Sequence, residues 1–160
     1  SGVALRAAGS DEFKVSHWEM VSRGAIWDVA ATRVTSHLPV PARGLFASLA
    51  PVSIYFYDGA ECLRQHDENR NAFTRPRGYS CEELGGALWG WDDDFPQVER
   101  LSVTAPLFIS PWGSGSSRYV DVLVSDEGIR AIWQQSQADG SQPLVTHFLP
   151  MEEVEQLLAG

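Results

Sequence analysis

Residues 66–68 suggest the first specific chemistry, because His66-Asp67-Glu68 has the H-x-E spacing of the zinc deaminases. In that reaction the imidazole binds the metal, the carboxylate moves protons, and a downstream P-C-x-x-C pair completes the zinc ligands. Here Cys81, in the stretch SCEEL, is the only cysteine that follows. Only half of the motif is present, so the sequence favours a polar loop over a zinc site.

Cys62 and His66 have the residue types of a nucleophilic thiol and its base, and a spacing of four puts both on one face of a helix. A reactive thiolate also needs a positively charged environment, and only Arg64 is near in sequence. The alternative function is therefore a small enzyme of unrecognised type. Its site would lie within residues 61–94 and combine Cys62, His66 and Glu68 with the aspartates at 92–94.

Other catalytic and cofactor signatures are missing from the sequence. There is no H-E-x-x-H, no paired C-x-x-C, no G-x-S-x-G, no P-loop and no dinucleotide-binding glycine pattern. The histidines are scattered along the chain, at positions 17, 37, 66 and 147. We therefore expect no bound metal and no organic cofactor.

The stretch ALWGWDDDFP, residues 87–96, sets aromatic residues around three consecutive aspartates. Three adjacent carboxylates repel one another and cannot all face one ion, which argues against a metal site. Large rings are costly to leave in water and carboxylates are costly to bury, so the segment belongs at a boundary, with rings inward and carboxylates outward. Such a boundary segment is suited to docking on a basic protein, in which aromatic anchors supply contact and carboxylates supply orientation. The predicted partner-binding residues are Glu82, Glu83, Trp91, Asp92, Asp93, Asp94, Phe95 and Trp112.

The overall charge points the same way, with a formal net charge of -9 and a sequence pI of about 4.8. An acidic surface repels nucleic-acid phosphates and speeds encounter with basic proteins, so we expect a basic protein partner and no nucleic acid. The same charge also keeps a protein soluble without any partner, and this simpler explanation stays open. No apolar run approaches the roughly 20 residues of a membrane span.

The predicted architecture is a single α+β domain over residues 11–160, mainly antiparallel sheet with a few short helices packed on it. Residues 1–10 are expected to be a flexible leader or an expression remnant. Strands are predicted at 12–20, 52–59, 97–112, 118–125, 129–135 and 143–149, with Asp58-Gly59 as a turn. Helices are predicted at 22–38, 39–51, 81–91 and 150–160.

Taken together, the sequence predicts a non-enzymatic acidic inhibitor that occludes a basic partner. Bacterial immunity proteins that neutralise toxins have this character, although no motif here identifies such a family. A reduced cytoplasmic chain is favoured. An exported chain with a Cys62–Cys81 disulfide stays open, as does the oligomeric state.

Overall fold

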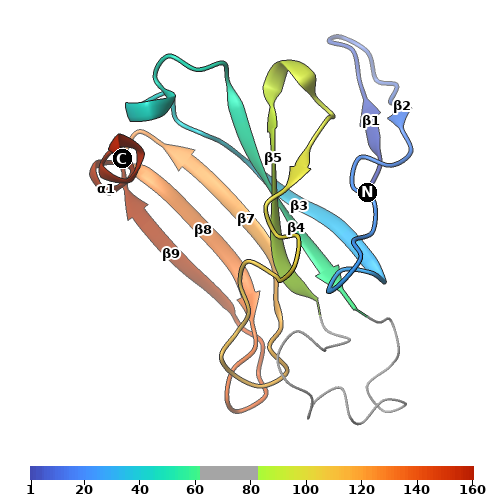
Figure 1. The fold of residues 1–160 in the computed structure, drawn as a ribbon, viewed down its shortest axis with the longest axis vertical. Helices are drawn as coiled ribbons and strands as arrows, with labels where there is room; N and C mark the ends of the chain where they lie inside the picture. Colours follow the sequence, from blue (N-terminus) through green and yellow to red (C-terminus); the bar gives the residue numbers. More distant parts are fainter. Residues whose placement is uncertain (62–82) are drawn as a thin grey trace.

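Antiparallel sheets make up most of the computed structural model, which describes residues 1–61 and 83–160. One sheet has four strands in the order β3-β4-β5-β6, another has three in the order β7-β8-β9, and β1 and β2 form a separate pair (Figure 1). The strands are β1 (Val3–Leu5), β2 (Lys14–His17), β3 (Ala31–Pro39), β4 (Val52–Ala60), β5 (Leu84–Trp91), β6 (Glu99–Arg100), β7 (Ser117–Ser125), β8 (Gly128–Gln135) and β9 (Leu144–Pro150). The helical elements are two short 3-10 turns, η1 (Gly44–Phe46) and η3 (Asp92–Asp94), and one α-helix, α1 (Met151–Ala159).

The predicted α+β class is wrong. Strands account for 43% of the described residues and helical elements of all kinds for 11%. Among the described residues, α1 is the one α-helix. Two of the predicted helices are strands instead, which leaves a mostly β protein. With nine residues, α1 is far too short to cross a bilayer, and no other described helix is longer.

The helix predicted at 22–38 is instead an irregular segment followed by β3. The spacing of Ile26, Val29 and Val34 resembles the apolar face of an amphipathic helix. However, β3 is rich in β-branched residues, which favour strands, and it pairs with β4 from Ala31 opposite Ala60 to Pro39 opposite Ser53. Tertiary pairing therefore decided the conformation of this segment.

The helix predicted at 81–91 is also wrong, because Leu84–Trp91 form the inner strand β5. Its two glycines lie under aromatic rings: a Cβ on Gly85 would stand 1.9 Å from Phe108, and one on Gly86 would stand 2.5 Å from Tyr57. The glycines thus permit close approach of rings to the sheet. Strand β4 is confirmed at 52–59, but Asp58-Gly59 continues the strand rather than turning.

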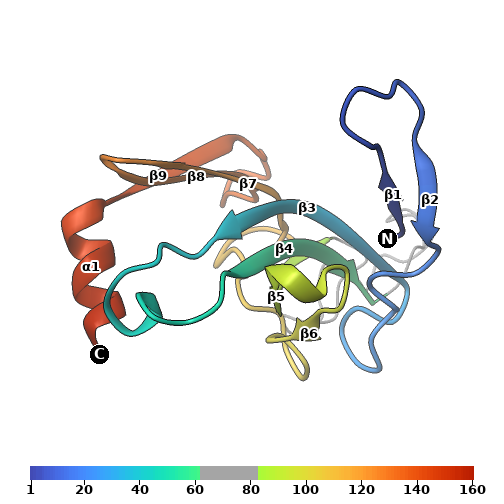
Figure 2. The same cartoon turned by 90° about the horizontal axis from the view of Figure 1, so that it is seen from above.

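The last third of the chain matches its prediction. Strands β7, β8 and β9 pair consecutively and α1 follows, with Val154 buried beneath it. Strand β9 is an edge strand that starts directly after Pro143 and ends at Pro150. Figure 2 shows α1 at one end of the two sheets, where Glu155 pairs with Arg43 just before η1.

The two larger sheets meet where β7 lies against β3, β4 and β5 (Figure 2). Five side chains form what we call the ionic junction there. Arg33 Nη2 lies 2.8 Å from both Asp58 Oδ2 and Glu83 Oε1, and Arg118 Nη1 lies 3.4 Å from Glu83 Oε2. The guanidinium carbons of Arg33 and Arg118 lie 4.5 and 4.9 Å from the centre of the Tyr119 ring. Tyr119 has a φ of 58°, a left-handed conformation that is unusual for this residue type.

Candidate functional site

The three consecutive aspartates form the turn η3, directly after β5. The turn is held by its backbone, because the Asp92 N–H donates to the Pro51 carbonyl at 2.9 Å and the Gln97 N–H donates to the Asp94 carbonyl at 2.9 Å. All three carboxylates are exposed, whereas Trp91 is half-buried and the Phe95 side chain is 40% exposed. The carboxylates face outward as expected, whereas the ring of Phe95, expected to point inward, is exposed. We call residues 91–95 the acidic tip.

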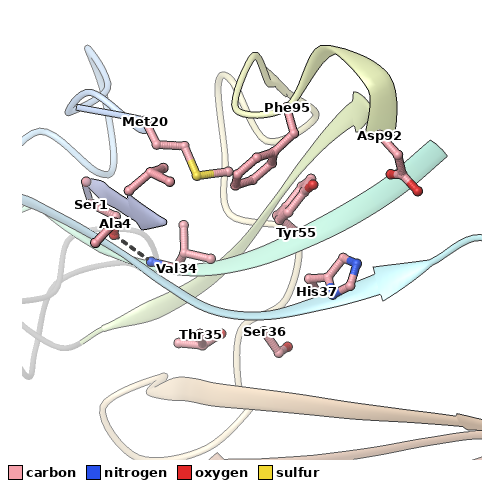
Figure 3. A pocket seen from close by; sticks show the side chains of 12 residues that line it. Ser1, Ala4, Met20, Val34, Thr35, Ser36, His37, Tyr55, Asp92 and Phe95 are labelled. Atoms are coloured by element: carbon pink, nitrogen blue, oxygen red, sulfur yellow. Dashed lines mark hydrogen bonds between the residues drawn. The ribbon is translucent and has the colours of Figure 1, made fainter. Parts of the chain in front are cut away.

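An open groove of about 660 Å³ lies beside the acidic tip (Figure 3). Asp92 and Phe95 form one side, Tyr55 and Val34 lie on its floor, and Met20 reaches over from the segment before β3. We call this hollow the aromatic groove.

A short row of rings runs along the aromatic groove. The centroids of Tyr55 and Phe95 are 6.1 Å apart, and those of His37 and Tyr55 are 5.5 Å apart, with interplanar angles of 29° and 30°. The opposite side is formed by residues 1–4, where the Ser1 hydroxyl accepts a hydrogen bond of 2.9 Å from the Val34 N–H. The groove therefore presents flat apolar faces with a carboxylate at one side.

The Asp92 carboxylate lies close enough to the floor of the aromatic groove to affect the pKa of Tyr55. Burial raises the pKa of the Tyr55 phenol above its ordinary value, and the negative charge of Asp92 raises it further. The phenol therefore keeps its proton, and the ring faces the groove uncharged.

A second, smaller hollow of about 210 Å³ also borders the acidic tip, and Trp89, Trp91 and Asp94 line part of it. The two indole rings meet edge to face at 5.6 Å. Side chains alternate along β5, so Trp89 and Trp91 lie on the opposite face of the strand from Leu88, which pairs with Tyr55. We call this the tryptophan hollow.

Both hollows combine a carboxylate with aromatic rings. A lysine or arginine side chain suits this combination, because its charge is attracted to the carboxylate and to the face of the ring, while its methylene stem covers apolar surface. The tip can therefore receive basic side chains on two sides.

Two of the predicted partner-binding residues lie away from the acidic tip. Glu83 precedes β5 at the end opposite Asp92, about 30 Å along an extended strand, and its carboxylate belongs to the ionic junction. Trp112 is 53% exposed, but it lies in the loop before β7 and lines neither the aromatic groove nor the tryptophan hollow. The structure does not bring these two residues to the tip.

Several predicted site residues lie outside the described part of the chain. Glu82 is one, and Cys62, His66 and Glu68 of the alternative enzyme site are the others. Within residues 1–61 and 83–160, no group of three or more His, Cys, Asp or Glu side chains is placed to hold a metal ion.

Sequence reasoning missed the side chains that form the aromatic groove: Met20, Val34, His37 and Tyr55. Tyr55 lay in a confidently expected strand, and its alternation with Phe56 could have assigned it to one face of the sheet. Nothing local indicates that Met20 crosses over to it.

Comparison of the chain with protein-family models, with curated proteins and with solved structures finds no match in any of the three.

Proposed function

We propose that this chain is a non-enzymatic protein-binding module, of the inhibitor or immunity type, whose acidic tip docks on a basic partner protein. The tip enters the partner's basic cleft, and basic side chains of the partner occupy the aromatic groove and the tryptophan hollow.

One observation carries the proposal: three exposed carboxylates on a short, backbone-anchored turn lie between two ring-lined hollows. A rigid turn loses little conformational freedom on binding, so more of the contact energy remains for affinity. The net charge of -9 supports the choice of a basic partner, because complementary charge raises the rate of encounter.

The central test reverses the tip charges in the variant D92K/D93K/D94K. A matched control, D126K/E127K/E153K, makes the same change in net charge at exposed carboxylates around the β7–β8 turn and the start of α1. Basic proteins are captured from the native lysate on the wild-type chain and both variants, and the captured partner is then purified. Its association rate is measured at several salt concentrations.

The expected result is that the partner stays on the wild-type chain and on the control but leaves the tip variant. The association rate of the tip variant should fall by about tenfold or more at low salt and become less sensitive to salt. Equal association rates for the two triple variants would show that the acidic tip is not part of the interface.

The rings are tested separately with Phe95→Ala. A partly exposed ring at the centre of a contact acts mainly on the lifetime of the complex, so this variant should dissociate faster with little change in association rate. Leu123→Ala, at an exposed apolar position on β7, is the control for loss of exposed apolar surface.

A further inference from the structure

A cavity of about 420 Å³ lies between the two larger sheets, away from the acidic tip. Its volume falls within the range of small-molecule pockets, roughly 300–1,000 Å³. On the side of the four-stranded sheet its wall is Phe56 of β4 and the adjoining Phe108. On the side of the three-stranded sheet the wall is Val120, Ala131 and Trp133.

The aromatic wall is held in place by the backbone. Phe108 crosses β5 at Gly85, where the two residues form a β-bridge and the absent side chain leaves room for the ring. The rings of Phe56 and Phe108 meet edge to face, with centroids 6.3 Å apart. The space between the sheets is therefore bounded by fixed, flat surfaces.

A few polar groups also line the cavity. Trp133 Nε1 donates a 3.0 Å hydrogen bond to Gln135 Oε1, which fixes that amide and leaves its NH₂ group as a donor. His147 lies opposite Ala131 across the β8–β9 pair, on the cavity face, and Ser117 contributes a hydroxyl. Apolar walls with a few convergent polar groups are the usual composition of a small-molecule site.

We propose that this inter-sheet cavity binds a flat, uncharged aromatic molecule that carries one hydroxyl or carbonyl group. The rings of Phe56, Phe108 and Trp133 contact its faces and edges. The NH₂ group of Gln135 hydrogen-bonds its polar group. None of the described residues lining the cavity is an Asp, Glu, Lys or Arg, so a charged ligand would lose its hydration without compensation.

The probe for the first test is 2-naphthol, a fused pair of rings with one hydroxyl, titrated calorimetrically into the whole chain. Ala131→Trp fills the cavity, whereas Ile132→Trp puts the same indole on the outer face of the same strand. Saturable one-to-one binding is expected for the wild-type chain and for I132W. In A131W the dissociation constant should rise at least tenfold.

A second pair of measurements tests the polar end of the site. Naphthalene has the same rings without the hydroxyl and should bind about two- to tenfold more weakly than 2-naphthol, the value of one hydrogen bond. The variant Q135L should abolish that ratio while still binding both probes.

Two results would overturn the proposal: no saturable binding of 2-naphthol to the wild-type chain, or equal affinity in A131W and the wild-type chain. If A131W does not fold, the indole N–H resonance of Trp133 in the wild-type chain decides, identified by its loss in Trp133→Phe. Saturating 2-naphthol should shift that resonance, and an unmoved signal places the probe elsewhere and rejects the site.

Discussion

Asp58 and Tyr119 stand 61 residues apart in the chain, yet the Tyr119 backbone N–H donates to the Asp58 carboxylate, 3.0 Å from Oδ1. This bond joins β4 to β7 and holds Tyr119 in its left-handed conformation. The Asp58 side chain is 1% exposed, so the ionic junction joins the two sheets through a buried acceptor.

Removing that acceptor should cost stability. Asp58→Ala leaves the Tyr119 N–H without its partner and leaves Glu83 as the carboxylate paired with Arg33, and we expect the free energy of unfolding to fall by about 1–3 kcal/mol. Asp58→Asn keeps an acceptor oxygen of similar size and should lose less than half as much. Urea unfolding of both variants measures the difference, and equal losses would mean that the acceptor contributes nothing.

The same carboxyl group should make stability depend on pH. Burial raises the pKa of Asp58 above its ordinary 3.8, in spite of Arg33 and the Tyr119 N–H. The folded chain therefore holds this proton more tightly than the unfolded chain. The contribution of Asp58 to the free energy of unfolding falls as pH rises from about 3.8 through the raised value.

The measurement compares the wild-type chain with Asp58→Asn at a series of pH values, because the other acids cancel in the difference. The stability of the wild-type chain relative to the variant should be greatest below about pH 3.8 and decline as the pH rises towards 7. A relative stability that increases over this interval would show that the ion pair with Arg33 outweighs burial.

Gly85 should tolerate no side chain while Phe108 is present. Gly85→Ala puts a methyl group in the space that the Phe108 ring occupies, and it should lower the free energy of unfolding by about 1–3 kcal/mol. In the Phe108→Ala background the same change should cost much less. This double-mutant cycle, measured by chemical unfolding, tests the contact directly, and additive losses would argue against it.

The Tyr55 phenol reports the position of the nearest aspartate. Asp92→Asn should lower the pKa of Tyr55, because the charge that opposes its ionisation is gone. Asp94→Asn, whose carboxylate borders the tryptophan hollow, is the control and should leave the pKa nearly unchanged. Titration of the Tyr55 ring signals by NMR, assigned with Tyr55→Phe, measures both. Similar effects of the two variants would show that Asp92 has no special proximity.

Local sequence determined the fold only where pattern and pairing agreed. From β7 to α1, alternating strands and short turns made the structure predictable. Between 22 and 38 the apolar spacing suited a helix, and only the pairing of Val34 with Tyr57 revealed a strand. At β5 a run of small and apolar residues resembled a weak helix. The two glycines are instead needed because aromatic rings occupy the space above Gly85 and Gly86, which the sequence does not show.

Of the candidate site, the sequence predicted the acidic tip but not the aromatic groove. The balance between ring burial and carboxylate hydration placed the acidic tip at the surface, since that balance depends on neighbouring residues alone. The aromatic groove depends on Met20, Tyr55 and Phe95 meeting from three separate segments, which no local pattern encodes. The place of Glu83 in the ionic junction could not be predicted for the same reason, because its partners Arg33 and Arg118 lie far along the chain.

Pro150, at the end of β9, limits growth of the three-stranded sheet at that edge. An unpaired edge strand is a template on which another chain can add a strand, and runaway addition leads to aggregation. The Pro143 carbonyl accepts from the Gln135 N–H and so faces β8, and by alternation along β9 Pro150 faces the open edge. Pro150 has no backbone N–H to offer an incoming strand, so strand addition is blocked at that end of β9.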